Sequence, residues 1–170
     1  MCKCSTLIIY IFISILSFSQ REYGLEYQHG FGKSYNSNSI GGIFENLSNE
    51  PSSWQVGIQY TWDIFITNKK TQGIGDFGIL LGYRYHFSYG NSGNLIAGVR
   101  TTFSFLTEKA HTKFTPSFEF GYHYTFNEFN SGGFTTSSLN LGYDMPIGKE
   151  KAEDYKGFLF IPRIAIGYRY

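Results

Sequence analysis

The alternation of bulky and small side chains over residues 158–170 predicts the kind of element that builds this chain. Successive side chains of a β-strand point to opposite faces, so residues of one parity share a face. One face of the segment carries bulky apolar residues, namely Phe158, Phe160, Ile164, Ile166, Tyr168 and Tyr170. The other face carries Arg163, Ala165, Gly167 and Arg169. We therefore expect a strand whose apolar face extends to the aromatic residue at position 170.

The same alternation recurs along the chain and predicts eight strands in all. They cover residues 22–32, 38–46, 54–66, 75–89, 94–106, 113–127, 134–147 and 157–170, and the second is the weakest of them. The segments between them are rich in Gly, Asn, Ser and Lys, which is typical of turns. An even number of antiparallel strands can close with both chain ends on one side. The sequence thus predicts an all-β, eight-stranded antiparallel up-and-down barrel.

The volume of such a barrel indicates which face points outward. An eight-stranded barrel has an interior just wide enough to be filled by side chains. Nearly every predicted strand contributes several Phe, Tyr, Trp, Leu or Ile residues to its apolar face, and these cannot all point inward. The opposite parity holds glycines and polar residues, including Gly57, Gly82, Gly121 and Gly142. We therefore expect the apolar face to point outward into lipid, which makes the barrel transmembrane.

Composition supports strands over helices. Aromatic residues make up 19% of the chain and 20 positions are Gly, whereas charged residues reach only 16%. Aromatic side chains suit a pleated sheet, and interior glycines weaken helices. The apolar run at residues 7–18, preceded by Lys3 and followed by Ser17-Phe-Ser19, is typical of a signal peptide. We expect residues 1–19 to be a signal peptide and residues 20–170 to be an outer-membrane β-barrel domain.

Removal of the signal peptide changes the charge and the cysteine content. It takes away Cys2, Cys4 and Lys3, which leaves no cysteine and equal numbers of basic and acidic residues, 13 of each. A disulfide or a thiolate metal site is then not expected. The balanced charge also gives no reason to expect a nucleic-acid partner.

The inward parity predicts a charged network inside the barrel. It collects four acids, Glu26, Asp63, Glu119 and Asp144, opposite four arginines, Arg84, Arg100, Arg163 and Arg169, with His86 and His123 between them. Buried charges are tolerated when they are paired, so we expect hydrogen-bonded pairs that fill the lumen. For Arg163 and Arg169 the expected partner is Glu26 on the neighbouring first strand.

These features together resemble the small eight-stranded outer-membrane β-barrels of Gram-negative bacteria. The resemblance rests on the signal peptide, the length near 150 residues, the eight alternating strands and the final Tyr168-Arg-Tyr170. The Ser-Phe-Ser-Gln junction at 17–20 and the Tyr- and Asn-rich chain look like the Bacteroidetes members. The resemblance implies that Tyr168 and Tyr170 form a signal read by the barrel-assembly machinery. Family members include anchors, adhesins, narrow pores and lipid-modifying enzymes, so the resemblance selects no function.

One short motif suggests catalysis. His86-Phe-Ser88 is similar to the His-x-Ser pair of outer-membrane lipid A deacylases, in which Ser is the nucleophile and His the base. Residues two apart on a strand share a face, and Glu119 could orient the histidine, as an activated serine requires. In that family, however, the pair lies toward the last strands and opens to lipid, whereas parity places His86 and Ser88 inward.

Other candidate motifs are weak. Gly32-Lys-Ser34 resembles the end of a phosphate-binding loop, but no glycine precedes it at the required spacing and no helix follows. The histidines show no metal-ligand spacing, and we expect no metal or other cofactor. The sequence therefore predicts a monomeric outer-membrane barrel in contact with lipid, without catalysis and with a structural or surface-interaction role. A lipid A acyl hydrolase that uses His86 and Ser88 is the first alternative, and a narrow transport pore is the second.

Overall fold

The computed structural model describes residues 20–33, 35–49, 51–65, 73–87, 93–106, 111–126, 131–147 and 156–170. These residues form eight strands, β1 (Gln20–Gly32), β2 (Tyr35–Asn49), β3 (Ser52–Phe65), β4 (Gly73–His86), β5 (Gly93–Leu106), β6 (His111–Thr125), β7 (Gly132–Ile147) and β8 (Gly157–Arg169). The predicted signal peptide, residues 1–19, lies outside the described residues. Among the described residues, no helix is long and apolar enough to cross a membrane.

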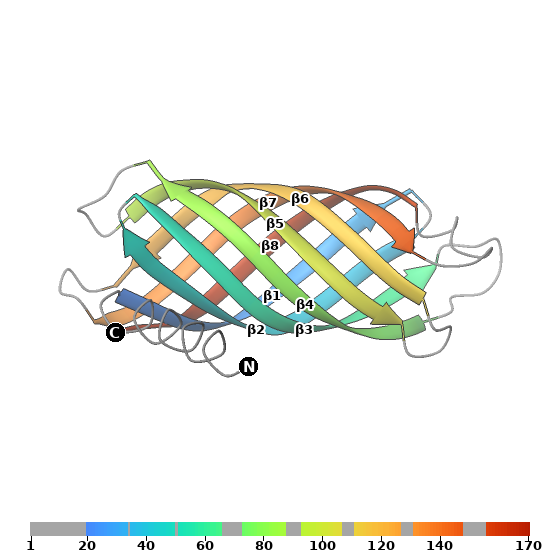
Figure 1. The fold of residues 1–170 in the computed structure, drawn as a ribbon, viewed down its shortest axis with the longest axis horizontal. Coiled ribbons are helices and arrows are strands. Elements are labelled where there is room, and N and C mark those ends of the chain that lie inside the picture. Colours follow the sequence, from blue (N-terminus) through green and yellow to red (C-terminus); the bar gives the residue numbers. More distant parts are fainter. Residues whose placement is uncertain are drawn as a thin grey trace, which may run out of the picture.

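The strands form one closed antiparallel barrel in the order of the sequence, and β8 pairs with β1 (Figure 1). Where β1 begins and β8 ends, Tyr170 N donates to Arg21 O at 2.9 Å and Arg21 N donates to Tyr170 O at 3.3 Å. We call this end of the barrel the terminal end. The opposite end, where β1 leads to β2 and β7 leads to β8, is called the far end. The predicted fold class is confirmed.

The strand limits differ from the prediction mainly at β2. Its predicted range was 38–46, but the strand extends over Tyr35–Asn49. The reason is backbone pairing: Asn36 pairs with Phe31 of β1 on one side and with Ile64 of β3 on the other. Closure requires every strand to pair on both sides, so the neighbouring strands set the length of β2 although its own side chains alternate weakly.

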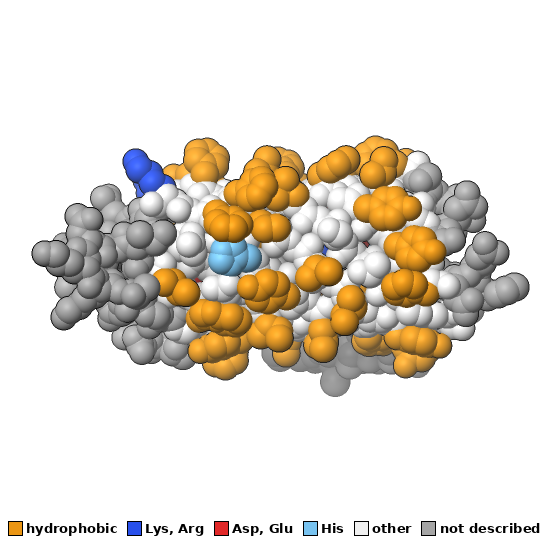
Figure 2. Space-filling model, turned by 180° about the vertical axis from the view of Figure 1, so that it is seen from behind, with side chains coloured by type: hydrophobic (Ala, Val, Ile, Leu, Met, Phe, Trp, Pro, Cys, Tyr) orange, Lys and Arg blue, Asp and Glu red, His pale blue; other side chains and the backbone are white. Residues whose placement is uncertain are grey.

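The outside of the barrel is apolar on every strand. Large exposed hydrophobic side chains include Leu25, Ile58, Phe77, Phe118 and Ile166, with Ile58 and Phe118 both 72% exposed. Figure 2 shows hydrophobic side chains over the whole described wall of one face, with hardly any charged side chain among them. A soluble barrel would bury this parity and expose the other. The side-chain distribution is thus reversed relative to a soluble barrel.

The interior contains more apolar side chains than the alternation predicted. Leu80, Ile96, Phe134 and Leu159 all point inward and are buried. Phe134 has a specific structural role: its ring lies over Gly24 and Gly167, which are cross-strand partners on β1 and β8. A Cβ on Gly24 would lie 2.8 Å from Phe134 Cζ, so the glycines leave the space that the ring fills. The lumen is therefore packed by both apolar and charged groups.

Candidate functional site

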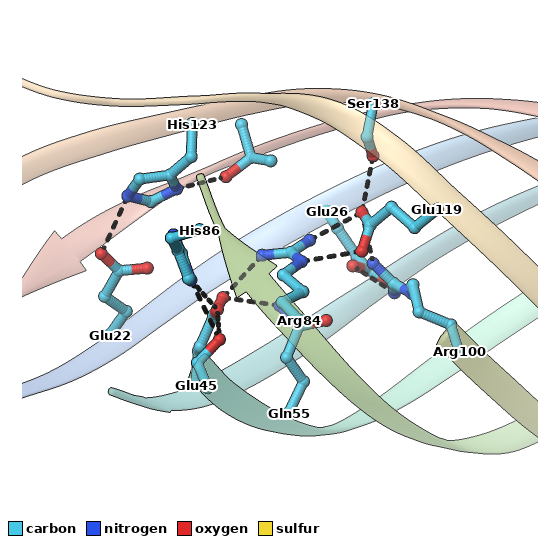
Figure 3. A network of polar contacts seen from close by, with 12 residues as sticks. Glu22, Glu26, Glu45, Gln55, Arg84, His86, Arg100, Glu119, His123 and Ser138 are labelled. Atoms are coloured by element: carbon cyan, nitrogen blue, oxygen red, sulfur yellow. Dashed lines mark hydrogen bonds and ion pairs between the residues drawn. The ribbon is translucent and has the colours of Figure 1, made fainter. Parts of the chain in front are cut away.

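The centre of the lumen is organised around Arg84, which extends from β4 across the barrel (Figure 3). Its Nε and Nη2 donate to Oε2 and Oε1 of Glu119 on β6, each at 2.7 Å. Its Nη1 donates to Glu45 Oε2 on β2 at 2.6 Å. The three side chains are fully buried. Because β4, β6 and β2 are not neighbours in the sheet, these bonds cross the lumen.

Two further arginines complete the central pairing. Arg100 of β5 donates from Nη2 to both carboxylate oxygens of Glu26 on β1, at 3.0 and 2.9 Å. Arg163 of β8 donates from Nε to Glu26 Oε2 at 2.7 Å and from Nη1 to Glu119 Oε1 at 3.0 Å. Ser138 of β7 also donates to Glu119 Oε1, at 2.7 Å. Gln55 of β3 donates to Glu45 Oε2 at 2.6 Å. All eight strands thus meet in one polar network through Glu26, Glu45, Gln55, Arg84, Arg100, Glu119, Ser138 and Arg163.

The energetics of this network depend on complete pairing. Hydrogen bonds between ionised partners are shorter and stronger than neutral ones, and the Arg84–Glu119 pair has the favourable two-bond geometry. Burial of an unpaired charge is costly, whereas a paired and hydrogen-bonded one is tolerated. The network also occupies the cross-section that an eight-stranded barrel leaves between its walls. The arrangement can hold the barrel wall together and fill its centre.

A second cluster lies toward the terminal end and contains Glu22. Arg169 Nε donates to Glu22 Oε1 at 2.7 Å, and His123 Nε2 lies 3.1 Å from the same oxygen. His123 Nδ1 lies 2.8 Å from Thr136 Oγ1. The expected partner of both Arg163 and Arg169 was Glu26, and for Arg169 this prediction was wrong. Arg169 is the direct cross-strand partner of Glu22, and six residues of strand separate it from Arg163 by roughly 20 Å, too far to share one carboxylate.

His86, the proposed base of the hydrolase alternative, lies inside the lumen next to Ser53 and Glu45. Its Nε2 is 3.1 Å from Ser53 Oγ and 3.6 Å from Glu45 Oε1. Ser53 Oγ donates a hydrogen bond to Glu45 Oε1 at 2.5 Å, so the hydroxyl is directed at the carboxylate. Glu119, the expected orienting acid, is held by arginines and Ser138 instead. Ser88 lies outside the described residues.

A third cluster lies toward the far end, where three aspartates surround one lysine. Lys113 Nζ on β6 is 2.9 Å from Asp63, 3.7 Å from Asp76 and 3.9 Å from Asp144. Thr115 donates a hydrogen bond to Asp144 Oδ1. Asp63 and Asp144 were expected opposite arginines, but their nearby cation is Lys113. The far end is thus chemically distinct from the arginine-rich centre.

The structure therefore places all nine residues of the predicted lumen network inside the barrel. These are Glu26, Asp63, Arg84, Arg100, Glu119, His123, Asp144, Arg163 and Arg169. Four charged members were missed, namely Glu22, Glu45, Asp76 and Lys113. The alternation of side chains along each strand could have assigned these residues to the lumen. Glu22 lies on the same face of its strand as Glu26, and Lys113 lies on the same face as Glu119. Three of the four lie at or beyond the predicted strand edges, or on the poorly alternating β2.

The terminal aromatic residues face outward. Tyr168 and Tyr170 are exposed, their ring centroids are 5.3 Å apart, and Tyr170 also meets Tyr23 of β1 edge to face at 5.8 Å. These rings form a small aromatic group at the terminal end. Their role as an assembly signal stays a prediction.

Within the part of the chain that the structure describes, no group of three or more His, Cys, Asp or Glu residues is arranged to hold a metal ion. The barrel, its apolar wall and its charged lumen define the class of protein: a closed eight-stranded barrel with a reversed distribution of side chains.

Comparison with known proteins gives a distant structural likeness. No family model matches the sequence, and no curated protein matches it. Among solved structures, the chain is similar to a major outer membrane protein from Thermus thermophilus, with 13% identity and a TM-score of 0.42. That match covers 88% of this chain and 99% of the other.

Proposed function

We propose that this chain is a monomeric barrel of the bacterial outer membrane with a structural or surface-interaction role and no catalysis. The observation that carries the proposal is the reversed distribution of side chains. Exposed Phe, Ile, Leu and Tyr residues cover the outside of the barrel, and charged residues fill the inside. An exposed apolar surface of this extent is unfavourable in water and favourable in hydrocarbon, where a closed barrel also satisfies its backbone groups.

The filled lumen supports a non-catalytic role. Arg84, Glu45 and Glu119 are fully buried and bonded across the centre. A polar interior of this kind fixes the barrel wall and leaves little room for a permeating solute. The Ser-Phe-Ser-Gln junction at 17–20 supports the further proposal of a Bacteroidetes-like source.

Cell fractionation tests the location. The full chain, with its leader, is expressed in a Gram-negative host, and membranes are separated on a density gradient. We expect the protein in the outer-membrane fraction, folded and resistant to extraction by salt and alkali. Recovery of folded protein in the soluble periplasmic fraction would contradict the proposal.

Two assays separate the proposed role from its alternatives. Purified protein in planar bilayers is expected to show no steady conductance, whereas a transport pore conducts. Lipid A from cells with and without the gene is expected to have the same acyl chains by mass spectrometry, whereas a hydrolase would remove an acyl chain. Steady conductance would show that the protein is a pore, and a lost acyl chain would show that it is a hydrolase. Either result would contradict the proposed structural role.

A further inference from the structure

Charge is distributed unevenly along the lumen. In the centre and at the terminal end, the negative charges of four glutamates equal the positive charges of four arginines. These residues are Glu22, Glu26, Glu45, Glu119, Arg84, Arg100, Arg163 and Arg169. The far-end cluster contains three carboxylates, Asp63, Asp76 and Asp144, against the single ammonium of Lys113. Three negative charges against one positive charge leave a formal charge of −2 there. Buried excess charge of this kind requires compensation.

Asp144 is the aspartate of this cluster that lines a cavity. The residue is fully buried, and Thr115 donates to its Oδ1. Its Oδ2 accepts no hydrogen bond from any described residue, and Lys113 Nζ is 3.9 Å from it, beyond hydrogen-bond distance. Lys113 is instead hydrogen-bonded to Asp63 at 2.9 Å. One carboxylate oxygen is thus left buried without a donor.

A small polar cavity lies directly beside Asp144. It has a volume of about 40 Å³, which exceeds the roughly 10–15 Å³ needed for one water molecule. Apart from Lys113, Leu159 and Ile161, its lining consists of oxygen-bearing side chains, namely Gln28, Ser37, Ser39, Gln59, Thr61, Thr102, Ser104, Thr115 and Asp144. Hydroxyl, amide and carboxylate oxygens are the ligands of hard cations, whereas none of the described lining residues is a histidine or a cysteine.

We propose that this cavity binds one hard divalent cation, of the Ca²⁺ type, with Asp144 Oδ2 as its anionic ligand. Ca²⁺ takes six to eight oxygen ligands in flexible geometry and accepts hydroxyls, amides and waters among them. Mg²⁺ demands a strict octahedron, which a cavity lined by side chains from seven strands is poorly suited to provide. One divalent ion also neutralises the formal charge of −2. The three aspartates around Lys113 do not themselves form the site, and neutral oxygens supply most of the ligands.

The cavity lies inside the lumen, so it is present whether the outer surface faces lipid, detergent or water. A failure to bind a cation therefore leaves the membrane proposal intact, and a soluble barrel could still bind Ca²⁺.

Calorimetric titration tests the site. Mature chain refolded in detergent is freed of metal with a chelator and titrated with CaCl₂. We expect one ion per chain with a dissociation constant on the order of 10⁻⁴–10⁻³ M, the range of extracellular Ca²⁺ modules. Asp144→Asn keeps the shape and removes the anionic oxygen, so binding should weaken by at least about tenfold. Glu128→Gln, which removes one negative charge from the connection between β6 and β7, should bind as the wild type does.

Each other outcome overturns the proposal. Absence of Ca²⁺ binding by the wild type would show that this cavity is not a cation site. Binding that Asp144→Asn leaves unchanged places the ion elsewhere, and equal binding of Na⁺ contradicts the divalent assignment. If Asp144→Asn does not fold, Thr102→Val provides the second variant. It removes one neutral oxygen at constant shape and should weaken binding severalfold, and unchanged binding would again exclude this cavity.

Discussion

Arg84 and Glu119 face each other across the lumen and form two parallel hydrogen bonds of 2.7 Å, from Nε to Oε2 and from Nη2 to Oε1. The two residues lie on β4 and β6, with β5 between them in the wall. Their pairing is therefore a contact through the interior of the barrel, in addition to the backbone ladder. It fixes the distance between β4 and β6, which backbone hydrogen bonds connect only through β5.

Loss of one partner of this pair should strongly destabilise the barrel. Glu119→Gln leaves the buried guanidinium of Arg84 without full compensation and also weakens the bonds from Arg163 and Ser138. Breaking a buried pair typically costs about 3–5 kcal/mol. The free energy of unfolding in urea, measured in lipid vesicles, should fall by that amount. A change below about 1 kcal/mol would show that the network contributes little to stability.

Arg169→Gln provides a matched comparison at the terminal end. Its side chain remains 13% exposed, and it pairs with Glu22 near the rim. Water can compensate part of the lost pairing there, so the loss of stability should be smaller than that caused by Glu119→Gln. Equal losses at the two positions would contradict the idea that burial sets the cost.

A charge on the outer wall should have a cost that depends on depth. Ile58 lies in the middle of β3 and is 72% exposed, whereas Phe105 lies near the end of β5. If the wall contacts lipid, Ile58→Arg should cost about 2–4 kcal/mol and Phe105→Arg about 0–1 kcal/mol. Unfolding in vesicles measures both. Unchanged stability of Ile58→Arg would indicate that this wall is not in hydrocarbon.

The close approach of β1 and β8 depends on Gly167. A Cβ at this position would overlap the carbonyl oxygen of Tyr23 and lie 2.6 Å from Phe134 Cε1. Gly167→Ala should therefore destabilise the barrel by about 1–3 kcal/mol through overpacking. Gly42→Ala is the matched control, because a Cβ there meets no atom within 4 Å. A comparable loss for both variants would show that glycine flexibility, and not space, decides the effect.

The terminal aromatic residue should affect assembly more than stability. Tyr170 is 67% exposed and lies beside Tyr23 and Tyr168. Tyr170→Asp should reduce the amount of folded protein in the outer membrane of expressing cells, whereas Tyr170→Phe keeps the ring and should assemble normally. Normal assembly of Tyr170→Asp would exclude the proposed signal. Refolding of both variants in detergent in vitro separates assembly from stability.

The parity of side chains was sufficient to predict the barrel and most of its interior. Arg84 and Glu119 could be placed in the lumen because regular alternation on β4 and β6 assigns each residue to a face. The limits of β2 could not be predicted in this way. Its length follows from pairing with β1 and β3, a property of the closed sheet and not of its own sequence.

The sequence also did not predict which charged residues pair with one another inside the lumen. Arg169 pairs with Glu22 because register places the two side by side, and register depends on how eight strands close together. The pairing of Asp63 with Lys113 joins β3 to β6 across the barrel, a contact that local alternation does not encode. Phe134 breaks the polar pattern of its face because two glycines opposite it leave space for a ring.

The central claim is that this chain is a closed barrel with an outer wall suited to lipid, and its need for detergent tests that claim most directly. Refolded mature protein is run on a gel with and without heating, and its size in solution is measured with and without detergent. We expect the folded and heated forms to migrate differently, and the protein to be monomeric in detergent and to aggregate on its removal. A folded, stable monomer in detergent-free buffer would contradict the account.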